Sequence, residues 1–121
     1  MKATKTIIVE DEAIIRLNLK LILQQMNCET IGETGKGESA INMTKELNPD
    51  FICMDIKLQG SIDGIETAKR IAEFSDIPII FMSAYSLKET QSISQIKNKS
   101  IFLVKPIQKQ QIEEAVRSIC S

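Results

Sequence analysis

The chain has 121 residues, a length typical of one domain with a single hydrophobic core. Its 15 basic and 16 acidic residues are interspersed and give a formal net charge of −1, so no basic surface for nucleic acid or acidic lipid is expected. No apolar run approaches the roughly 18 residues of a membrane span, and the three cysteines, with no histidine in the chain, match no zinc or redox pattern. We therefore expect one cytoplasmic domain, residues 1–121, that binds neither membranes nor DNA directly.

Five short apolar runs alternate with stretches of helical periodicity, a pattern typical of βα units in a mostly parallel sheet. The expected strands, in chain order, are Thr6–Val9, Thr30–Glu33, Phe51–Met54, Ile77–Met82 and Ile101–Val104. The Thr30–Glu33 run is short and mixed, which favours an edge strand, whereas continuous apolar runs are typical of strands buried on both faces. We predict an α/β fold: a doubly wound, flavodoxin-like sheet of five parallel strands in the order 2-1-3-4-5, with five helices.

Helices are expected after each of these strands. Apolar residues at helical spacing mark three of them: Ile14, Leu17 and Leu21 in the first, Ile65, Ala68 and Ala72 in the third, and Ile112, Ala115, Val116 and Ile119 in the fifth. Two capping boxes, Asp63–Glu66 and Ser86–Glu89, predict where the third and fourth helices begin. Pro49 ends the second helix, because proline disfavours the helical conformation in the residue before it.

Two features that suggest chemistry have better structural explanations. Cys53 lies in an apolar run, which favours a buried structural thiol. The glycines at 32, 35 and 37 superficially resemble a phosphate-binding loop, but the Gly-x-x-x-x-Gly-Lys-Ser/Thr spacing is absent. A loop after an edge strand explains these glycines better.

Polar residues follow four of the expected strands. Glu10 and Asp11 come after the first, Asp55 after the third, Ser83 after the fourth and Lys105 after the fifth. In open α/β sheets, ligands bind outside these carboxyl ends, where the winding direction switches. Each residue alone has a structural explanation, as a helix cap, a turn residue or a solvated charge. Their joint occurrence at four strand ends favours a functional site.

The chemistry of these residues is coherent. Carboxylates that repel one another favour a divalent cation, and Mg²⁺ prefers one or two carboxylates, water and phosphate oxygens. Asp55 can attack a phosphoryl group and form an aspartyl phosphate. The metal and Lys105 would neutralise charge on the phosphoryl oxygens, while the Ser83 hydroxyl donates a hydrogen bond to one of them. We therefore predict a Mg²⁺-dependent phosphoacceptor site centred on Asp55.

From Thr6 to about Ile119, the chain resembles the receiver domains of two-component response regulators, the CheY-like family. Five motifs in order carry the resemblance: Val9-Glu10-Asp11-Glu12, Met54-Asp55-Ile56-Lys57-Leu58, Asp63-Gly64-Ile65-Glu66, Ile80-Phe81-Met82-Ser83-Ala84 and Phe102-Leu103-Val104-Lys105-Pro106. The resemblance implies that Asp11 binds Mg²⁺ directly, that Glu10 binds it mostly through water, and that the backbone carbonyl of Lys57 completes the protein ligands. The sequence departs from the common pattern in having Glu at position 10 and a longer loop without proline between Asp55 and Gly64.

The resemblance also implies a switch and a donor. The Lys105–Pro106 bond should be cis, and Ser83 and Phe102 should move on phosphorylation, changing the face formed by the fourth helix, fifth strand and fifth helix. Because the chain has no histidine, the phosphohistidine of a sensor histidine kinase must act in trans, and the output partner is open. In the family, the residue two after the phosphoacceptor and the residue two after the Ser/Thr flank the path of the hydrolytic water. The resemblance implies this place for Lys57 and Tyr85, and neither resembles the acid or amide that would orient the water. The chain should therefore catalyse only its own phosphorylation and slow dephosphorylation.

Three other functions would be compatible with parts of this pattern. A flavodoxin-like electron carrier would share the fold, but the loop after the first strand is acidic where a flavin phosphate needs amides and hydroxyls. A Mg²⁺-dependent aspartyl phosphatase usually has a second acid two residues after the nucleophile, where this chain has Lys57. The remaining alternative is a receiver-fold interaction module that docks without phosphorylation, and the presence of Asp11, Asp55, Ser83 and Lys105 argues against it.

Overall fold

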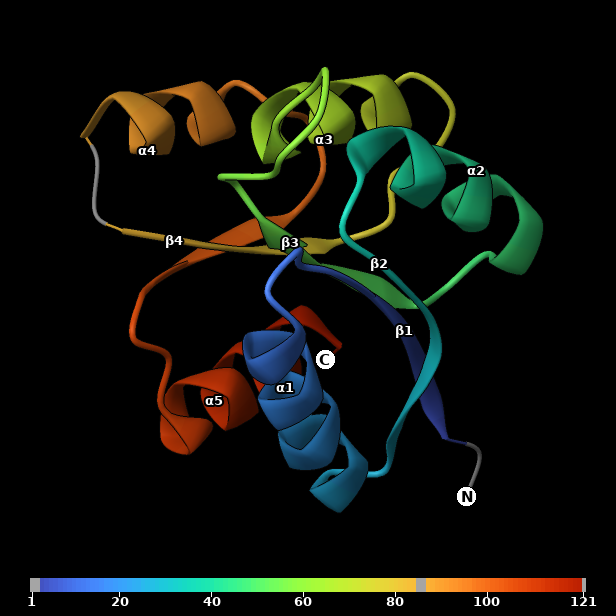
Figure 1. The fold of residues 1–121 in the computed structure, drawn as a ribbon, viewed down its shortest axis with the longest axis vertical. Helices are drawn as coiled ribbons and strands as arrows, with labels where there is room; N and C mark the ends of the chain where they lie inside the picture. Colours follow the sequence, from blue (N-terminus) through green and yellow to red (C-terminus); the bar gives the residue numbers. More distant parts are fainter. Residues whose placement is uncertain (1–2, 85–86, 121) are drawn as a thin grey trace.

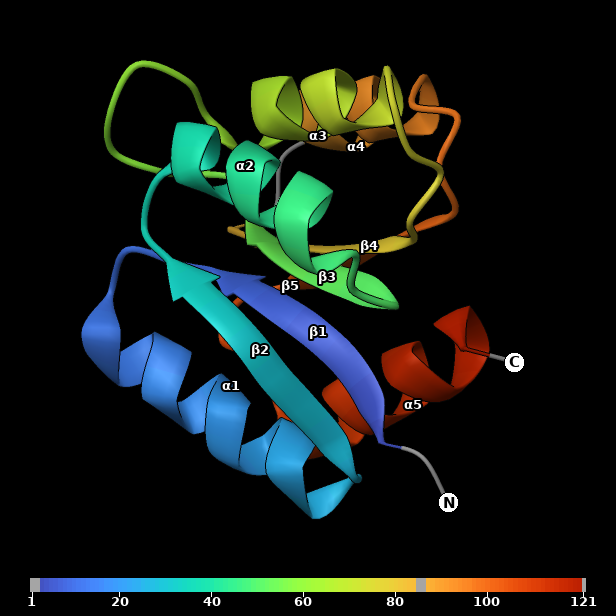
Figure 2. The same ribbon diagram turned by 90° about the vertical axis from the view of Figure 1, so that its right-hand side faces the viewer.

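The computed structural model describes residues 3–84 and 87–120. It contains a parallel sheet of five strands with helices on both faces (Figures 1 and 2). The elements are β1 (Thr4–Val9), α1 (Ala13–Gln25), β2 (Cys28–Thr34), α2 (Gly37–Leu47), β3 (Phe51–Asp55), α3 (Gly64–Ala72), β4 (Ile79–Ser83), α4 (Leu87–Ser94), β5 (Ser100–Val104) and α5 (Lys109–Ile119). The strand order β2-β1-β3-β4-β5 confirms the predicted doubly wound fold.

Helices α1 and α5 cover one face of the sheet, and α2, α3 and α4 cover the other (Figure 1). Each face has its own apolar core, because successive residues of a strand point to opposite sides. In β3, Phe51 and Cys53 pack with α1 and α5, whereas Ile52 and Met54 pack with α2 and α3. This two-sided burial explains why the central strands are nearly continuous apolar runs.

Strand β2 lies at an edge, as predicted, but it is longer than the Thr30–Glu33 run suggested. Thr6 pairs with Thr30 and Ile7 pairs with Gly32, so Ile31 is an extra residue in the ladder with β1. Such a bulge interrupts the alternation of side chains along a strand. The bulge explains why the sequence pattern of β2 looked short and mixed.

The ends of the helices agree with most of the predicted signals. Asp63 caps α3 by accepting a hydrogen bond from the backbone N–H of Glu66 at 2.8 Å, although the Glu66 carboxylate pairs with Arg70 at 3.0 Å and does not close the box. Helix α2 ends at Leu47, and Asn48 follows in the left-handed conformation with φ of 48°. The Ser86 half of the second predicted box lies outside the described residues.

Helix α1 buries a different stripe from the one that identified it in the sequence. Leu19, Ile22 and Leu23 face the core, whereas Ile14 and Leu17 are 84% and 56% exposed. Leu21 is also half exposed, at 50%. The helix is therefore apolar on two sides, and only one of them is used by the fold.

The predicted burial of Cys53 is confirmed, and this burial raises the pKa of its thiol to about 12. Cys28 is also buried, and Cys120 is exposed. Within residues 3–84 and 87–120, no helix has the length and apolar character needed to cross a membrane.

Candidate functional site

The carboxyl ends of four strands bring the predicted residues to one edge of the sheet. Glu10 follows β1, Asp55 is the last residue of β3, Ser83 is the last of β4, and Lys105 follows β5. The backbone N–H of Lys105 donates to the Ser83 carbonyl at 2.8 Å, which ties the last two strand ends together. The Lys105–Pro106 bond is cis, as the resemblance implied.

Three carboxylates form a cluster that fits a divalent cation. Glu10, Asp11 and Asp55 each offer one oxygen, and these oxygens lie within 4.8 Å of one another. Glu10 and Asp55 are 0% and 2% exposed, whereas Asp11 is half buried and reaches solvent. An all-oxygen donor set open to water on one side is the kind of site that Mg²⁺ occupies. The residues present therefore fit the metal that the sequence predicts.

Lys105 supplies the positive charge of the site. Its Nζ lies 3.0 Å from Oε1 of Glu10 and 3.3 Å from Oδ1 of Asp55. Burial alone would lower the pKa of Lys105, but the hydrogen bond to Glu10 and the charge of Asp55 outweigh it and raise this pKa. The cluster thus combines three carboxyl groups with one ammonium group, an arrangement in which the acids outnumber the base.

Glu10 is the most constrained of the three acids. Burial raises the pKa of its carboxyl from 4.5 to about 7, although Lys105 and the backbone N–H of Glu12 both act to lower it. The Glu12 N–H donates to Oε2 of Glu10 at 3.2 Å, so the side chain folds back over its own turn. Helix α1 begins at Ala13 with Glu12 as its N-cap, and Asp11 is thus not the cap that a purely structural explanation required.

Ser83 has a buried hydroxyl that finds no hydrogen-bond partner among residues 3–84 and 87–120. A buried hydroxyl without a partner costs on the order of 1 to 3 kcal/mol. It sits at the end of β4, one position beyond Met82, which pairs with Asp55 of β3. A hydrogen-bond acceptor bound at the strand ends would remove this cost.

The loop after β3 is held close to the site by Gly64. A Cβ added there would lie 2.2 Å from the carbonyl oxygen of Asp55, so only glycine lets α3 begin so near the strand end. Within the loop, the Lys57 N–H donates to Oδ1 of Asp55 at 3.3 Å, while the Lys57 ammonium lies 3.6 Å from Glu89. The Lys57 carbonyl is thus on the loop beside Asp55, and its role as a metal ligand stays a prediction.

Of two further predicted residues, Phe102 and Tyr85, the structure describes only Phe102. Phe102, in β5, is half buried and packs against the core on the side of α3 and α4. Its role as a switch residue stays a prediction. Tyr85 lies outside the described residues.

Sequence reasoning missed Arg16, whose guanidinium approaches the site from α1. Its Nη1 donates to the backbone carbonyl of Glu10 at 2.6 Å, and its Nε lies 3.2 Å from the Glu33 carboxylate. In the sequence, an arginine on an amphipathic helix is typically a solvated charge. Arg16 contacts the acidic turn only because the fold places the start of α1 beside the end of β2.

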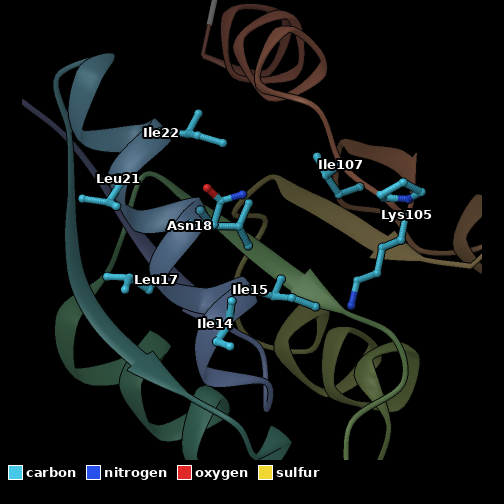
Figure 3. A pocket seen from close by; sticks show the side chains of 10 residues that line it. Ile14, Ile15, Leu17, Asn18, Leu21, Ile22, Lys105 and Ile107 are labelled. Atoms are coloured by element: carbon cyan, nitrogen blue, oxygen red, sulfur yellow. The ribbon is translucent and has the colours of Figure 1, made fainter.

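An apolar groove of about 690 Å³ lies directly beside Lys105. Figure 3 shows Ile15, Asn18 and Ile22 of α1 pointing across the groove toward Ile107 and Lys105. The exposed residues Ile14, Leu17 and Leu21 also line it on α1. The spacing of Ile14, Leu17 and Leu21 predicted the helix, but it did not indicate that they would line a groove.

Comparison with known proteins agrees with this architecture. The family model for the response regulator receiver domain matches residues 6–117. The chain is 31% identical over 116 residues to the chemotaxis protein CheY of Thermotoga maritima, covering 95% of this chain and 96% of that protein. The transcriptional regulatory protein PdtaR of Mycobacterium tuberculosis is 33% identical over 102 residues, which are 84% of this chain and 49% of PdtaR. The chain thus spans about half the length of that relative.

A solved structure shows the same fold. The signal receiver domain of a modulated diguanylate cyclase from Desulfovibrio desulfuricans G20 is 28% identical and superposes with a TM-score of 0.86, covering 97% of this chain and 93% of that one. With five parallel strands in the order 2-1-3-4-5 and the family match over residues 6–117, the chain belongs to the response regulator receiver domain family of two-component systems.

Proposed function

We propose that the chain accepts a phosphoryl group on Asp55 in a Mg²⁺-dependent reaction whose donor is the phosphohistidine of a sensor histidine kinase. The observation that carries this proposal is the cluster of three carboxylate oxygens within 4.8 Å of one another, with the Lys105 ammonium 3.3 Å from Asp55. An acid nucleophile, a cation site and a fixed positive charge are the parts that phosphoryl transfer to a carboxylate needs.

In the proposed transfer, an Asp55 oxygen forms the new bond to phosphorus while the phosphorus–nitrogen bond to the donor imidazole breaks. The electron pair of that bond returns to the imidazole nitrogen, which leaves with the donor. Glu10, Asp11, Asp55 and the Lys57 carbonyl would hold Mg²⁺, whose charge offsets the charge on the phosphoryl oxygens. Lys105 keeps its proton and neutralises another of these oxygens.

The Ser83 hydroxyl would link phosphorylation to a change of shape. A phosphoryl oxygen on Asp55 supplies the acceptor that the buried hydroxyl does not have among the described residues. Movement of Ser83 toward that oxygen frees space at the end of β4, next to β5. We propose that the half-buried Phe102 turns into this space and that the surface of α4, β5 and α5 changes for an output partner.

The apolar groove beside Lys105 suits the donor. The chain has no histidine, so the phosphohistidine must come from another molecule that approaches the Asp55 edge. Lys105 belongs both to the groove and to the phosphoacceptor site, and a partner seated in the groove therefore lies next to Asp55. An exposed apolar surface of this kind is typical of a protein interaction site.

The phosphorylated state is proposed to be long-lived, and turnover as an enzyme is not expected. Lys57 is a cation held near Glu89, and a cation does not orient an attacking water by accepting its proton. Decay of the phosphorylated protein in Mg²⁺, followed for wild type, Lys57→Asn and Tyr85→Ala, tests this point. Faster decay in the variants supports shielding by these side chains, and unchanged decay removes them from the mechanism.

The proposal is tested with acetyl phosphate as donor. Wild type should gain one adduct of phosphate mass that requires Mg²⁺ and is cleaved by hydroxylamine, as an acyl phosphate is. Asp55→Ala should gain none, because no other described carboxylate lies at the end of β3. A wild-type rate of phosphorylation in Asp55→Ala would contradict the assignment. Absence of any adduct on wild type would favour the alternative of an interaction module that docks without phosphorylation.

A further inference from the structure

The acidic turn after β1 is held from outside the site by a small network of charges. Arg16, on α1, donates from Nη1 to the Glu10 carbonyl at 2.6 Å and from Nε to Glu33, near the end of β2, at 3.2 Å. Glu33 also accepts a hydrogen bond from Lys20 at 2.5 Å. One guanidinium therefore connects the turn that carries the metal-binding acids to the edge strand.

We propose that Arg16 is a positioning residue for the Mg²⁺ site, oriented by Glu33 and acting through the backbone of Glu10. The inference rests on the proposed Mg²⁺-dependent function and deepens it by naming a residue outside the metal-binding cluster. Residues that orient metal ligands in this way typically change metal affinity when they are altered, even though they never touch the ion.

The geometry favours positioning, because the guanidinium contacts the backbone carbonyl of Glu10, and the carboxylate that it binds is that of Glu33, outside the metal-binding cluster. A planar guanidinium can serve two acceptors at a fixed angle, so the Glu10 carbonyl and the Glu33 carboxylate define each other's position. The pKa of Glu33 is lowered, mainly by its hydrogen bond to Lys20 and also by Arg16, so Glu33 stays ionised as an anchor.

The same turn is also fixed from the side of β2. The Glu10 N–H donates to the Thr34 carbonyl at 2.8 Å, and a Cβ added at Gly35 would lie 3.0 Å from Cα of Asp11. Arg16, Gly35 and Asp11 line one hollow of about 450 Å³ beside the site. The turn is thus enclosed by β2 and Arg16, and loss of the guanidinium leaves one side of it without support.

Charge and position predict opposite results, which makes the proposal testable. Arg16 is a cation near an acidic site, so its removal should tighten Mg²⁺ binding if only Coulomb repulsion of the metal matters. If Arg16 positions the turn, its removal should weaken binding. Arg16→Lys distinguishes the charge effect from the positioning effect, because lysine keeps the positive charge but cannot bind both acceptors as a planar guanidinium does.

The experiment is a calorimetric titration of the metal-free full chain with MgCl₂ at fixed ionic strength and without any phosphodonor. We expect Arg16→Gln and Arg16→Lys to bind Mg²⁺ about tenfold more weakly than wild type. Glu33→Gln should show a smaller loss in the same direction, since Arg16 remains but loses its orientation. The matched control is Arg70→Gln, which removes another arginine–glutamate pair, at 3.0 Å on α3, and should leave the affinity unchanged.

Backbone amide NMR shifts supply a second readout in the metal-free state. Arg16→Lys should shift the amide signals of Glu10 and Asp11, and Arg70→Gln should not. Equal or tighter Mg²⁺ binding in both Arg16 variants, with wild type binding normally, would overturn the inference and leave the phosphoacceptor proposal intact. Failure of wild type itself to bind Mg²⁺ would overturn both.

Discussion

Two neighbouring regions of the molecule, the phosphoacceptor site and the groove along α1, meet at Lys105. The first buries polar side chains, and the second exposes apolar ones. On one side, Glu10, Asp55 and Ser83 are polar and almost completely buried. On the other side, the groove along α1 is apolar and largely open to solvent. Polar groups are normally buried only when satisfied, and large apolar patches are normally covered.

Folding alone explains neither region. Burying a carboxylate and exposing a leucine both cost free energy, and the rest of the core offsets these costs. A bound cation and a phosphoryl oxygen would complete the buried site, while a docked partner would cover the groove. Different ligands would thus complete the two regions, and Lys105 borders both of them.

The largest expected effect is a difference in the free energy of unfolding between substitutions on the buried side and on the groove side of α1. Leu23→Ala empties a fully buried position and should lower the free energy of unfolding by about 3 kcal/mol. Leu17→Ala removes the same atoms from the groove side, where the residue is 56% exposed, and should change it by less than about 0.5 kcal/mol. Urea denaturation of both variants measures the two losses in the free energy of unfolding. Equal losses would mean that the groove side contributes to the core after all.

The next effect concerns the buried side of the comparison. Asp11→Ala should weaken Mg²⁺ binding by about a hundredfold and Glu10→Ala by about tenfold, because a direct ligand contributes more than one acting through water. Titration with MgCl₂ checks the ranking. If Glu10→Ala proved the more damaging, the fully buried acid would be the direct ligand.

A smaller effect is expected when the groove is made polar. Ile14→Ser combined with Leu17→Ser should slow phosphoryl transfer from a phosphohistidine donor by about tenfold, since the contact area for a partner is lost. Phosphorylation by acetyl phosphate, which needs no docking surface, should be unchanged. The control is Phe74→Ser, which alters an exposed apolar residue on the opposite face of the sheet. Equal slowing with both donors would show damage to the site and not to docking.

The sequence predicted the layers of the fold and the convergence at the strand ends because both depend on local patterns. Alternating βα units fix the layers, and the end of each apolar run places one polar residue at the same edge. The order β2-β1-β3-β4-β5 confirms the flavodoxin-like order that was predicted with them. Strand β2 was underestimated because a bulge at Ile31 breaks its alternation.

The parts that sequence could not supply depend on contacts between distant residues. Periodicity shows that α1 has apolar residues at Ile14, Leu17 and Leu21, but it does not say which of two apolar stripes faces the sheet. The contact of Arg16 with the Glu10 carbonyl likewise depends on how α1 packs beside β2. The deep burial of Glu10 follows from the arrangement of three strand ends, which no local pattern records.

The smallest effect, the pH dependence of stability, tests whether burial of Glu10 costs free energy. Its folded-state pKa of about 7 lies above the ordinary 4.5, so the folded protein holds this proton more tightly than the unfolded chain. Stability of the metal-free protein should therefore fall as pH rises from about 4.5 to about 7. The expected change is on the order of 1 kcal/mol.

Glu10→Gln isolates this contribution, since glutamine keeps the shape of the side chain without its titration. Urea denaturation in EDTA at pH 5 and pH 8 should show a smaller loss of stability for the variant than for wild type over this interval. Mg²⁺ should act in the opposite sense in wild type, because it binds the deprotonated carboxylate and its affinity should rise through the same pH range. An identical loss in both proteins would show that the buried carboxylate is already compensated by Lys105. Burial of the Glu10 carboxylate would then carry no measurable cost in the free energy of unfolding.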